Sequence, residues 1–132
     1  MLLALQRATH HTLHALATAL AQLDLTASEI NTLANLADRQ PRNVSELSTD
    51  TGIRTTTLTG VLDRLERRGY LTRELDAADR RSFRLVLTAP GKAVAARVHR
   101  AVSRLERNAL AGLSARQLTG YHTVIRALQE VS

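Results

Sequence analysis

Residues 44–71 of the 132-residue chain, VSELSTDTGIRTTTLTGVLDRLERRGYL, decide its fold. A short helix is predicted to end at Gly52, because glycine readily adopts the left-handed conformation that follows a helix. A second helix is predicted from about Thr55 to Arg68, and its inward positions are apolar: Leu58, Val61, Leu62 and Leu65. Two helices joined by so short a turn indicate a helix–turn–helix motif.

The second of these helices begins with a run of hydroxyl side chains, TTTLT (residues 55–59). Threonine is a poor former of helix interiors, so helix propensity does not explain the run. At this end of a helix–turn–helix, hydroxyl groups can bind phosphates and bases, and threonine methyl groups can contact thymine. We therefore predict major-groove contacts from five residues, with one threonine serving only as a helix cap: Arg54, Thr55, Thr56, Thr57 and Thr59.

Farther along the same helix, two kinds of residue can be interpreted. Arg64 is predicted to reach a DNA phosphate, whereas Arg67 and Arg68 fit ordinary solvated surface. Gly60 is costly in a helix interior. It is consistent with a close approach of the backbone to DNA or with tight packing, and the sequence does not choose between them.

The charged stretch that follows, DAADRRSFRLVLT (residues 76–88), predicts one half of a β-hairpin. Large apolar side chains at positions 83, 85 and 87 alternate with Arg84 and Val86, which indicates a half-buried strand over about residues 82–87. A first strand is predicted over about residues 71–75. A hairpin directly after a helix–turn–helix is a wing, and its charged tip can reach the neighbouring minor groove, whose negative potential attracts arginine.

Four charged residues of this hairpin are the predicted wing contacts. We expect the Asp79 carboxylate to orient the Arg81 guanidinium through paired hydrogen bonds. Arg80 and Arg84 are expected to meet phosphates. The alternative is a solvated turn with a surface ion pair, which contributes little in general. The position of the hairpin after a helix–turn–helix favours the DNA contact.

Helices are also predicted before the compact middle region, residues 44–87. Apolar residues recur at helical spacing over residues 2–23. Thr26 and Glu29 form a capping box that starts a helix ending at about Arg39. Ser45 is predicted to cap the short helix that comes next.

After the hairpin, the run from Thr88 to Gly91 opens a long helix to about Leu110, and a second capping box opens a last helix over residues 115–130. The terminal helices carry apolar faces that the compact middle region is too small to cover, so a second copy is expected to complete the core. Packing of these helices on one another within a monomer is the alternative. The predicted fold class is mainly α with a small β-hairpin wing, a winged helix–turn–helix with terminal helices forming a dimerisation region.

Composition narrows the classes of function. The net charge is +6, almost all of it from arginine, which suits nucleic acid or another anionic surface but also a solvated helical surface. The chain has no cysteine, which excludes disulfides and thiolate metal sites. We find neither a long apolar run nor a signal peptide, and expect a cytoplasmic, nucleoid-associated protein without a membrane partner. We find no catalytic residue set and expect that the protein is not an enzyme.

The order of elements and two motifs resemble the multiple-antibiotic-resistance regulator (MarR) family of winged helix–turn–helix repressors. The more specific motif is DxxDRRxxxxxLTxxG, which begins at Asp76 and ends at Gly91. The second is DRLERRGYL, residues 63–71. The resemblance covers essentially the whole chain and implies a single MarR-like domain over residues 1–132.

The resemblance implies a ligand-responsive repressor that binds a near-palindromic DNA operator as an obligate homodimer. Residues 1–24 and 90–132 would form the dimerisation helices, and residues 25–89 the winged helix–turn–helix lobe. The second helix of the motif, the recognition helix, would enter the major groove. Arg81, oriented by Asp79, would enter the minor groove. A nonspecific or architectural DNA-binding protein is the alternative function.

Many members of the family release DNA when a small aromatic acid or another amphiphile binds between the lobe and the dimer helices. The resemblance therefore implies a small-molecule effector, phenolic or another organic anion. His10 and His14 are four residues apart on the first helix, which is a metal-ligand spacing, but no further ligands complete a site. We predict no bound metal and no cofactor. Zinc sensing and an anion pocket stay open for His10, His11 and His14, and a dimer or solvent surface is favoured.

Overall fold

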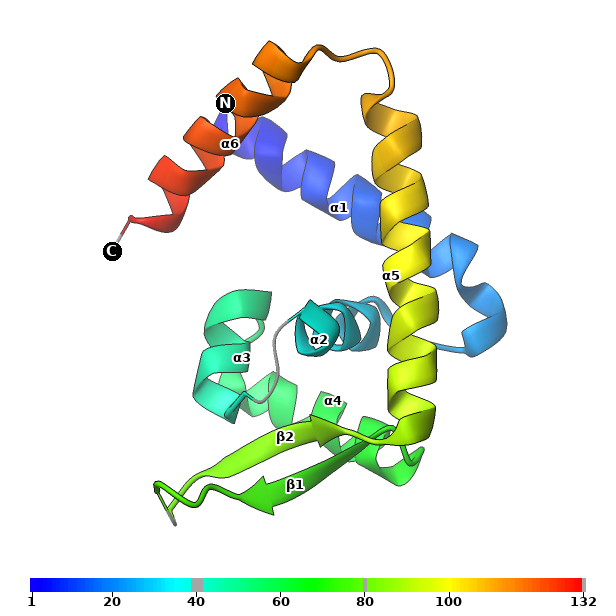
Figure 1. The fold of residues 1–132 in the computed structure, drawn as a ribbon, viewed down its shortest axis with the longest axis vertical. Helices are drawn as coiled ribbons and strands as arrows, with labels where there is room; N and C mark the ends of the chain where they lie inside the picture. The colour runs from blue at the N-terminus through cyan, green and yellow to red at the C-terminus, as the bar shows by residue number, and fades with distance from the viewer. Residues whose placement is uncertain (39–41, 80, 132) are drawn as a thin grey trace.

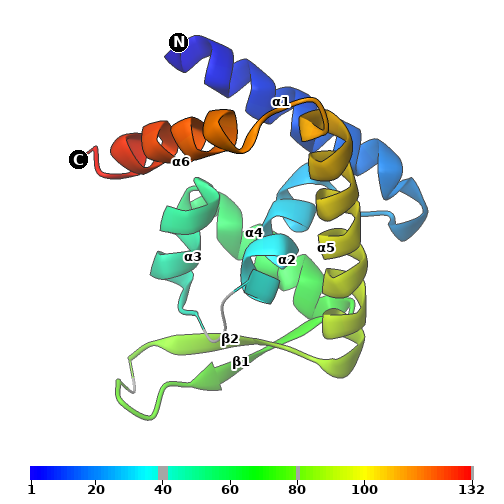
Figure 2. The ribbon, with the colours of Figure 1, turned by 45° about the horizontal axis from the view of Figure 1, so that its top comes forward.

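A computed structural model describes residues 1–38, 42–79 and 81–131, and this part of the chain forms six α-helices and one hairpin. In chain order the elements are α1 (Leu2–Ala19), a 3₁₀ turn (Ala21–Leu23), α2 (Ala27–Asp38), α3 (Val44–Thr51), α4 (Thr55–Arg67), β1 (Leu71–Leu75), β2 (Phe83–Leu87), α5 (Ala89–Leu110) and α6 (Ala115–Gln129). Figures 1 and 2 show two parts, a lobe made of α2, α3, α4, β1 and β2, and an arm made of α1 and α6. The long helix α5 runs from one to the other, and α1 also packs directly on α2 and α5 through a second buried cluster of Leu16, Leu20, Ile30 and Val98. The predicted fold class, mainly α with a hairpin wing, is confirmed.

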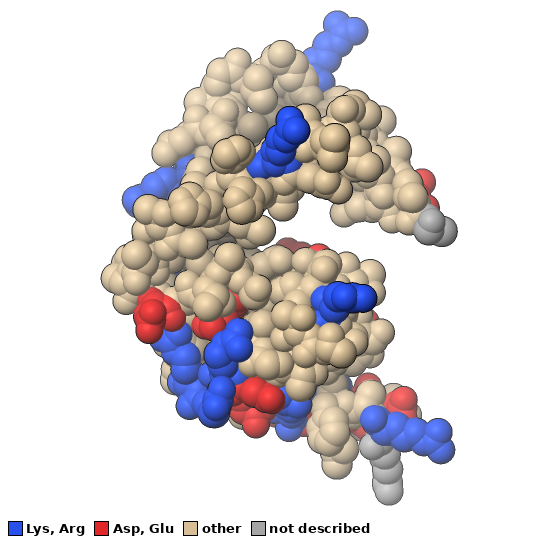
Figure 3. All heavy atoms as spheres, turned by 180° about the vertical axis from the view of Figure 1, so that it is seen from behind, with Lys and Arg blue, Asp and Glu red and all other residues tan. Residues whose placement is uncertain are grey.

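The arm buries little of its own apolar surface. No residue of α6 is buried, and Leu16 alone is buried in α1. Several large apolar side chains of these helices and their ends are exposed: Met1, Leu2, Leu3, Tyr121 and Val124. Figure 3 shows a deep indentation between the arm and the lobe. In the described part of the chain, no helix has the length and apolar character needed to cross a membrane.

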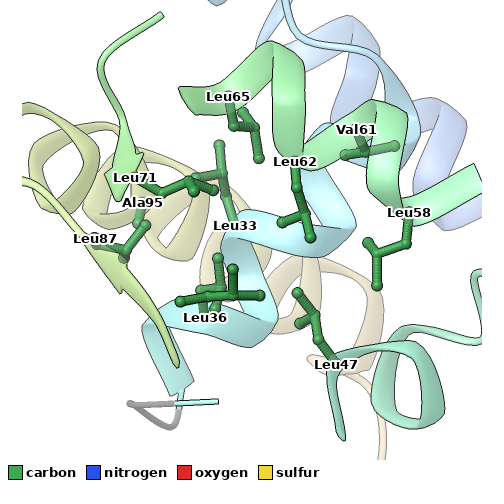
Figure 4. Close-up of a cluster of buried hydrophobic side chains, with 11 residues drawn as sticks. Leu33, Leu36, Leu47, Leu58, Val61, Leu62, Leu65, Leu71, Leu87 and Ala95 are labelled. Atoms are coloured by element: carbon green, nitrogen blue, oxygen red, sulfur yellow. The ribbon is translucent and has the colours of Figure 1, made fainter. Parts of the chain in front are cut away.

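A cluster of buried side chains holds the lobe together. Figure 4 shows side chains from α2, α3, α4, the hairpin and α5 converging on one another. The four predicted inward positions of α4 belong to this cluster, and none is more than 1% exposed: Leu58, Val61, Leu62 and Leu65. Burial of apolar area is the main stabilising term in folding. The packing of these four side chains therefore determines which side of α4 faces solvent.

The two strands pair antiparallel, with Leu71 opposite Leu87 and Leu75 opposite Phe83. The predicted strands are confirmed, except that β2 begins at Phe83 rather than at residue 82. Leu87 is 3% exposed, but Phe83 near the tip is 47% exposed. The apolar face of the wing is thus buried at its base and open toward its tip.

A third segment, at residue 42, joins the wing. Leu85 N donates a hydrogen bond to Arg42 O at 2.7 Å, which forms an isolated antiparallel bridge. The Arg42 side chain is 3% exposed and pairs with Asp50 of α3. Sequence reasoning did not predict this residue. It ties the middle of β2 to α3, so the wing and the helix–turn–helix are joined directly.

Three helix ends differ from the prediction. At the start of α2 only half of the predicted capping box forms: Glu29 N donates to Thr26 Oγ1 at 3.2 Å, but the Glu29 side chain binds Arg64 instead of Thr26 N. α1 ends at Ala19, and a 3₁₀ turn rather than an α-helix continues to Leu23. Asn43, not Ser45, caps α3: the Asn43 side chain accepts a hydrogen bond from Glu46 N at 2.8 Å, and the Glu46 side chain accepts one from Asn43 N. Ser45 lies inside the first turn of α3, where it cannot act as the cap. The predicted caps of α5 and α6 are confirmed.

The start of α5 packs tightly against the turn before β1. Thr88 N donates to Tyr70 O at 3.0 Å, and the Thr88 hydroxyl donates to Gly69 O. A Cβ atom at Gly91 would lie 1.8 Å from Tyr70 O, which is impossible without moving the backbone. The LTxxG part of the wing motif therefore fixes the angle at which α5 leaves the lobe.

Candidate nucleic-acid interface

The amino-terminal end of α4 is exposed and carries no side-chain cap. Arg54 occupies the N-cap position in an extended conformation. The four threonines predicted as contacts are all exposed, and the Thr59 hydroxyl donates back to Thr55 O at 2.9 Å. The expectation that one threonine caps this helix is wrong, because the helix begins at Thr55, one residue after the cap position.

This helix start is electrostatically suited to an anion. The first N–H groups of an α-helix have no partner within the helix, and the helix dipole places partial positive charge there. α4 has no acidic residue in its first turn, and Arg54 adds a cation beside it. Backbone N–H groups, hydroxyls and a guanidinium therefore meet at one exposed helix end, an arrangement that can bind a DNA phosphate and base edges.

Gly60 lies along the outer part of α4 rather than in a packed contact. Among the described residues, a Cβ atom at this position would meet only Arg64 Nη1, at an ordinary contact distance of 3.7 Å. Of the two interpretations of this glycine, tight packing within the chain is excluded. Gly60 itself is partly exposed on α4.

Asp79 organises the tip of the wing through the backbone. Its Oδ1 accepts a hydrogen bond from Arg81 N at 3.0 Å, and its carbonyl oxygen accepts one from Ser82 N at 3.1 Å. Within the described residues Asp79 forms no ion pair, so the expected pairing with the Arg81 guanidinium is absent. An aspartate that accepts from the N–H two residues on is a common turn device, and it leaves the Arg81 side chain exposed. Arg80 lies outside the described residues.

The arginines of the two strands have different surroundings. Arg84 of β2 is partly exposed. Arg73 of β1 pairs with two acids of α4, with Nη2 2.5 Å from Asp63 Oδ1 and Nε 3.0 Å from Glu66 Oε2. Arg84 is therefore available at the surface of the wing, whereas Arg73 joins the wing to α4.

Two arginines at the far end of α4 are bound within the chain. Arg64 Nε donates to Glu29 Oε1 at 3.2 Å. Arg68 donates to the carbonyl oxygens of Asp24 and Leu23 at 2.7 and 2.9 Å. Arg67 and Arg68 are both exposed, as predicted, but Arg68 also joins α4 to the segment between α1 and α2, which the sequence did not indicate. Any phosphate contact of Arg64 would compete with Glu29.

A cavity of about 240 Å³ lies between α1 and α5, and none of its lining residues belongs to the lobe, whereas an effector was expected between the lobe and these helices. Its lining combines small, apolar and polar side chains: Ala15, Leu16, Ala19, Ala101, Arg104, Leu105 and Asn108. His10, His11 and His14 are exposed on α1. The ranges that the structure describes hold no group of three or more His, Asp or Glu side chains able to bind a metal ion.

Sequence comparison points to one family. The MarR family model matches residues 25–83. The uncharacterized HTH-type transcriptional regulator YcgE of Bacillus subtilis (strain 168) is 38% identical over 71 residues, which are 53% of this chain and 46% of that protein. The match thus spans about half of the length of this curated relative.

Solved structures match the fold over nearly the whole chain. The structure of NadR in complex with 4-hydroxyphenylacetate has a TM-score of 0.89 at 22% identity, covering 98% of this chain and 92% of that one. The transcriptional repressor CouR, bound to a 23-mer DNA duplex, has a TM-score of 0.73 at 30% identity, covering 95% and 88%. The predicted winged helix–turn–helix fold is thereby confirmed.

Proposed function

Because the chain belongs to the MarR family, we propose that it is a sequence-specific DNA-binding transcriptional regulator, a repressor that responds to a ligand. It binds a near-palindromic operator as a homodimer, with α4 in the major groove and the wing in the minor groove. Residues 1–24 and 90–132 form its dimerisation helices, and residues 25–89 form its DNA-binding lobe. It acts in the cytoplasm, at the nucleoid.

The exposed, uncapped start of α4 in the same lobe as an exposed, charged wing is the observation that carries this proposal. Base contacts in the major groove specify sequence, whereas phosphate and minor-groove contacts fix register and read shape. A general basic surface does not need both elements. The proposed contacts of one protomer are Arg54, Thr55, Thr56, Thr57, Thr59, Arg80, Arg81 and Arg84, with Asp79 shaping the wing tip.

The arm supports the homodimer. α6 has no buried residue, and Tyr121 and Val124 are 54% and 41% exposed. Large exposed apolar surface marks an interaction site, and pairing of identical surfaces about a twofold axis is the commonest way to cover it. In such a dimer the two recognition helices meet successive major grooves about 34 Å apart.

The effector is proposed to be a small phenolic or other organic anion. NadR, which shares the fold, has been solved in complex with 4-hydroxyphenylacetate. In this chain Arg104 lines the cavity between α1 and α5 beside alanine and leucine side chains, a combination that suits an amphiphilic anion. The ligand releases DNA only if it binds the DNA-incompetent geometry better.

Binding to the DNA just upstream of the protein's own gene tests the proposal. Purified protein is titrated with excess unrelated competitor at several salt concentrations. We expect competitor-resistant binding to a short inverted repeat, at least about 10³-fold tighter than binding to unrelated DNA. Loss of all binding to competitor, with no site recovered by selection from random DNA, would instead identify a nonspecific or architectural DNA-binding protein.

A further inference from the structure

An ion cluster beside the recognition helix is not used by the proposed interface. This Glu29 cluster consists of Glu29 in the first turn of α2 and of Arg64 and Arg68 near the end of α4. The three residues line a cavity of about 490 Å³. Glu29 is only 3% exposed, and a buried carboxylate is costly unless cations hold it.

Both arginines face the buried carboxylate. Arg64 Nε lies 3.2 Å from Oε1, and Arg68 Nη1 lies 3.6 Å from Oε2. Among the described residues, Oε2 accepts no hydrogen bond. The backbone of Glu29 is also fixed, because its N–H donates to Thr26 Oγ1 at 3.2 Å. Removing the charge of Glu29 would therefore remove the main attraction that holds the Arg64 side chain in place.

Arg68 extends the cluster toward the arm. It donates to the carbonyl oxygens of Leu23 and Asp24, and its guanidinium carbon lies 5.1 Å from the centre of the Tyr70 ring. Asp24 has a positive φ of 51°, so the chain turns sharply at this point. The Glu29 cluster thus joins the end of α4, the first turn of α2 and the turn that leads back to α1.

Arg64 shares one side of α4 with the proposed base contacts. Thr57, Gly60 and Arg64 follow one another at spacings of three and four residues, which places them in one row along the helix. Gly60 has no side chain to separate the other two, and Arg64 is 45% exposed as a side chain. Without Glu29, the Arg64 guanidinium would be free to pair with a phosphate next to the recognition helix.

We propose that Glu29 is a specificity-determining positioning residue. It keeps two cations away from DNA phosphates and fixes α4 against α2, and the inference rests on the DNA-binding function proposed above. Nonspecific affinity comes almost entirely from phosphate neutralisation, whereas base contacts depend on where the recognition helix lies. The internal pairing therefore lowers the affinity for random DNA while it preserves the affinity for the operator.

The test compares Glu29→Gln with Glu106→Gln, which removes the same charge from an exposed position on α5. Binding to operator and to random-sequence DNA is measured over a series of salt concentrations. For Glu29→Gln the slope of log K against log salt should steepen by about 0.9 for each arginine released, and the specific-to-nonspecific ratio should fall about tenfold. Glu106→Gln should leave both quantities near their wild-type values.

A second substitution separates released arginine from damaged folding. Arg64→Gln alone should hardly change the slope of log K against log salt, because Arg64 is already paired with Glu29 in the wild-type protein and does not neutralise a phosphate. Added to Glu29→Gln, it should bring the slope back toward the wild-type value. An unchanged slope in Glu29→Gln, or an equal effect of Arg64→Gln in both backgrounds, would overturn the proposal. If Glu29→Gln does not fold, Arg64→Gln alone decides, since a clearly shallower slope contradicts the proposal.

The random-DNA measurement distinguishes this proposal from the proposed function. If the wild-type protein binds random DNA but does not prefer any operator, the regulator proposal fails. The slopes on random DNA still decide the role of Glu29 in that case. If the wild-type protein binds no DNA at all, both proposals are wrong.

Discussion

The lobe and the arm are built from similar helices, but only the lobe covers its own apolar surface. In the lobe, Leu33, Leu47 and Leu62 are each 0% exposed. In the arm, α6 has no buried residue. Figure 3 shows a matching difference in charge, with acidic and basic side chains gathered over the lobe and few of them on the arm. Helical spacing of apolar residues predicts which face is apolar, but it does not predict what covers that face.

The largest expected effects come from substituting one apolar residue in each region, because the lobe should lose stability and the arm should lose dimerisation. Leu62→Ala should lower the free energy of unfolding by about 2–5 kcal/mol, because it opens a cavity in the closed core of the lobe. Val124→Asp should instead raise the dissociation constant of the dimer at least about tenfold, because it places a charge in the proposed interface. Denaturant unfolding and sedimentation equilibrium measure the two effects. A dimer unaffected by Val124→Asp would show that this face of the arm is not the interface.

The next largest effect on stability is expected at the junction between lobe and arm, where α5 begins. Gly91→Ala should cost about 1–3 kcal/mol, because the added Cβ would overlap Tyr70 O and force the backbone apart. Gly112→Ala, after α5, is the matched control: apart from its chain neighbours, no described residue has an atom within 4 Å of its Cβ position, and its effect should stay within about 0.5 kcal/mol. Thermal unfolding of both variants checks the difference. Equal stability of the two would refute the close packing of α5 on the turn before β1.

A charge on the wing should matter for DNA more than a charge on the arm. Arg81→Ala removes the proposed minor-groove contact and should weaken operator binding about tenfold or more. Arg116→Ala removes the same charge from the first turn of α6 and should have little effect. Operator titrations at one fixed salt concentration measure both. The same loss from each variant would mean that overall charge, rather than the wing, controls binding.

The smallest effect concerns how the wing tip is held. The Asp79 side chain accepts from Arg81 N, and an asparagine side chain can accept the same hydrogen bond. Asp79→Asn should therefore bind the operator nearly as well as the wild type, while Asp79→Ala should lose about 0.5–1.5 kcal/mol of binding free energy. If Asp79→Asn and Asp79→Ala weaken binding equally, the carboxylate charge acts on an arginine in the complex. The proposed role of the hydrogen bond from Arg81 N is then wrong.

Local signals predicted most of the fold. The leucine spacing of α4 and the Thr88 cap involve residues close together in the chain, and both are confirmed. Asn43 shows a limit of such signals, because Ser45 offers a second plausible cap two residues away.

Contacts between distant segments could not be predicted in the same way. Arg68 binds Leu23 O across 45 residues, and nothing next to either residue indicates the other. For the candidate interface, the exposure of the threonines at the start of α4 follows from their helical positions. The partner of Arg64 does not follow from its position, because Glu29 lies on another helix and is itself buried.

If the protein binds DNA as proposed, the bridge between Arg42 and Leu85 would restrict the operator spacings that one protomer can accept. Because Arg42 joins β2 to α3, and α3 leads directly into α4, the two elements proposed to contact DNA are linked within one lobe. A base pair inserted within a half-site would therefore separate two contacts that the lobe links. A base pair inserted in the spacer between half-sites only requires the two lobes to reorient about the arms. The range of tolerated spacer lengths would thus report the stiffness of the junction that α5 and the packing of α1 on α2 form together.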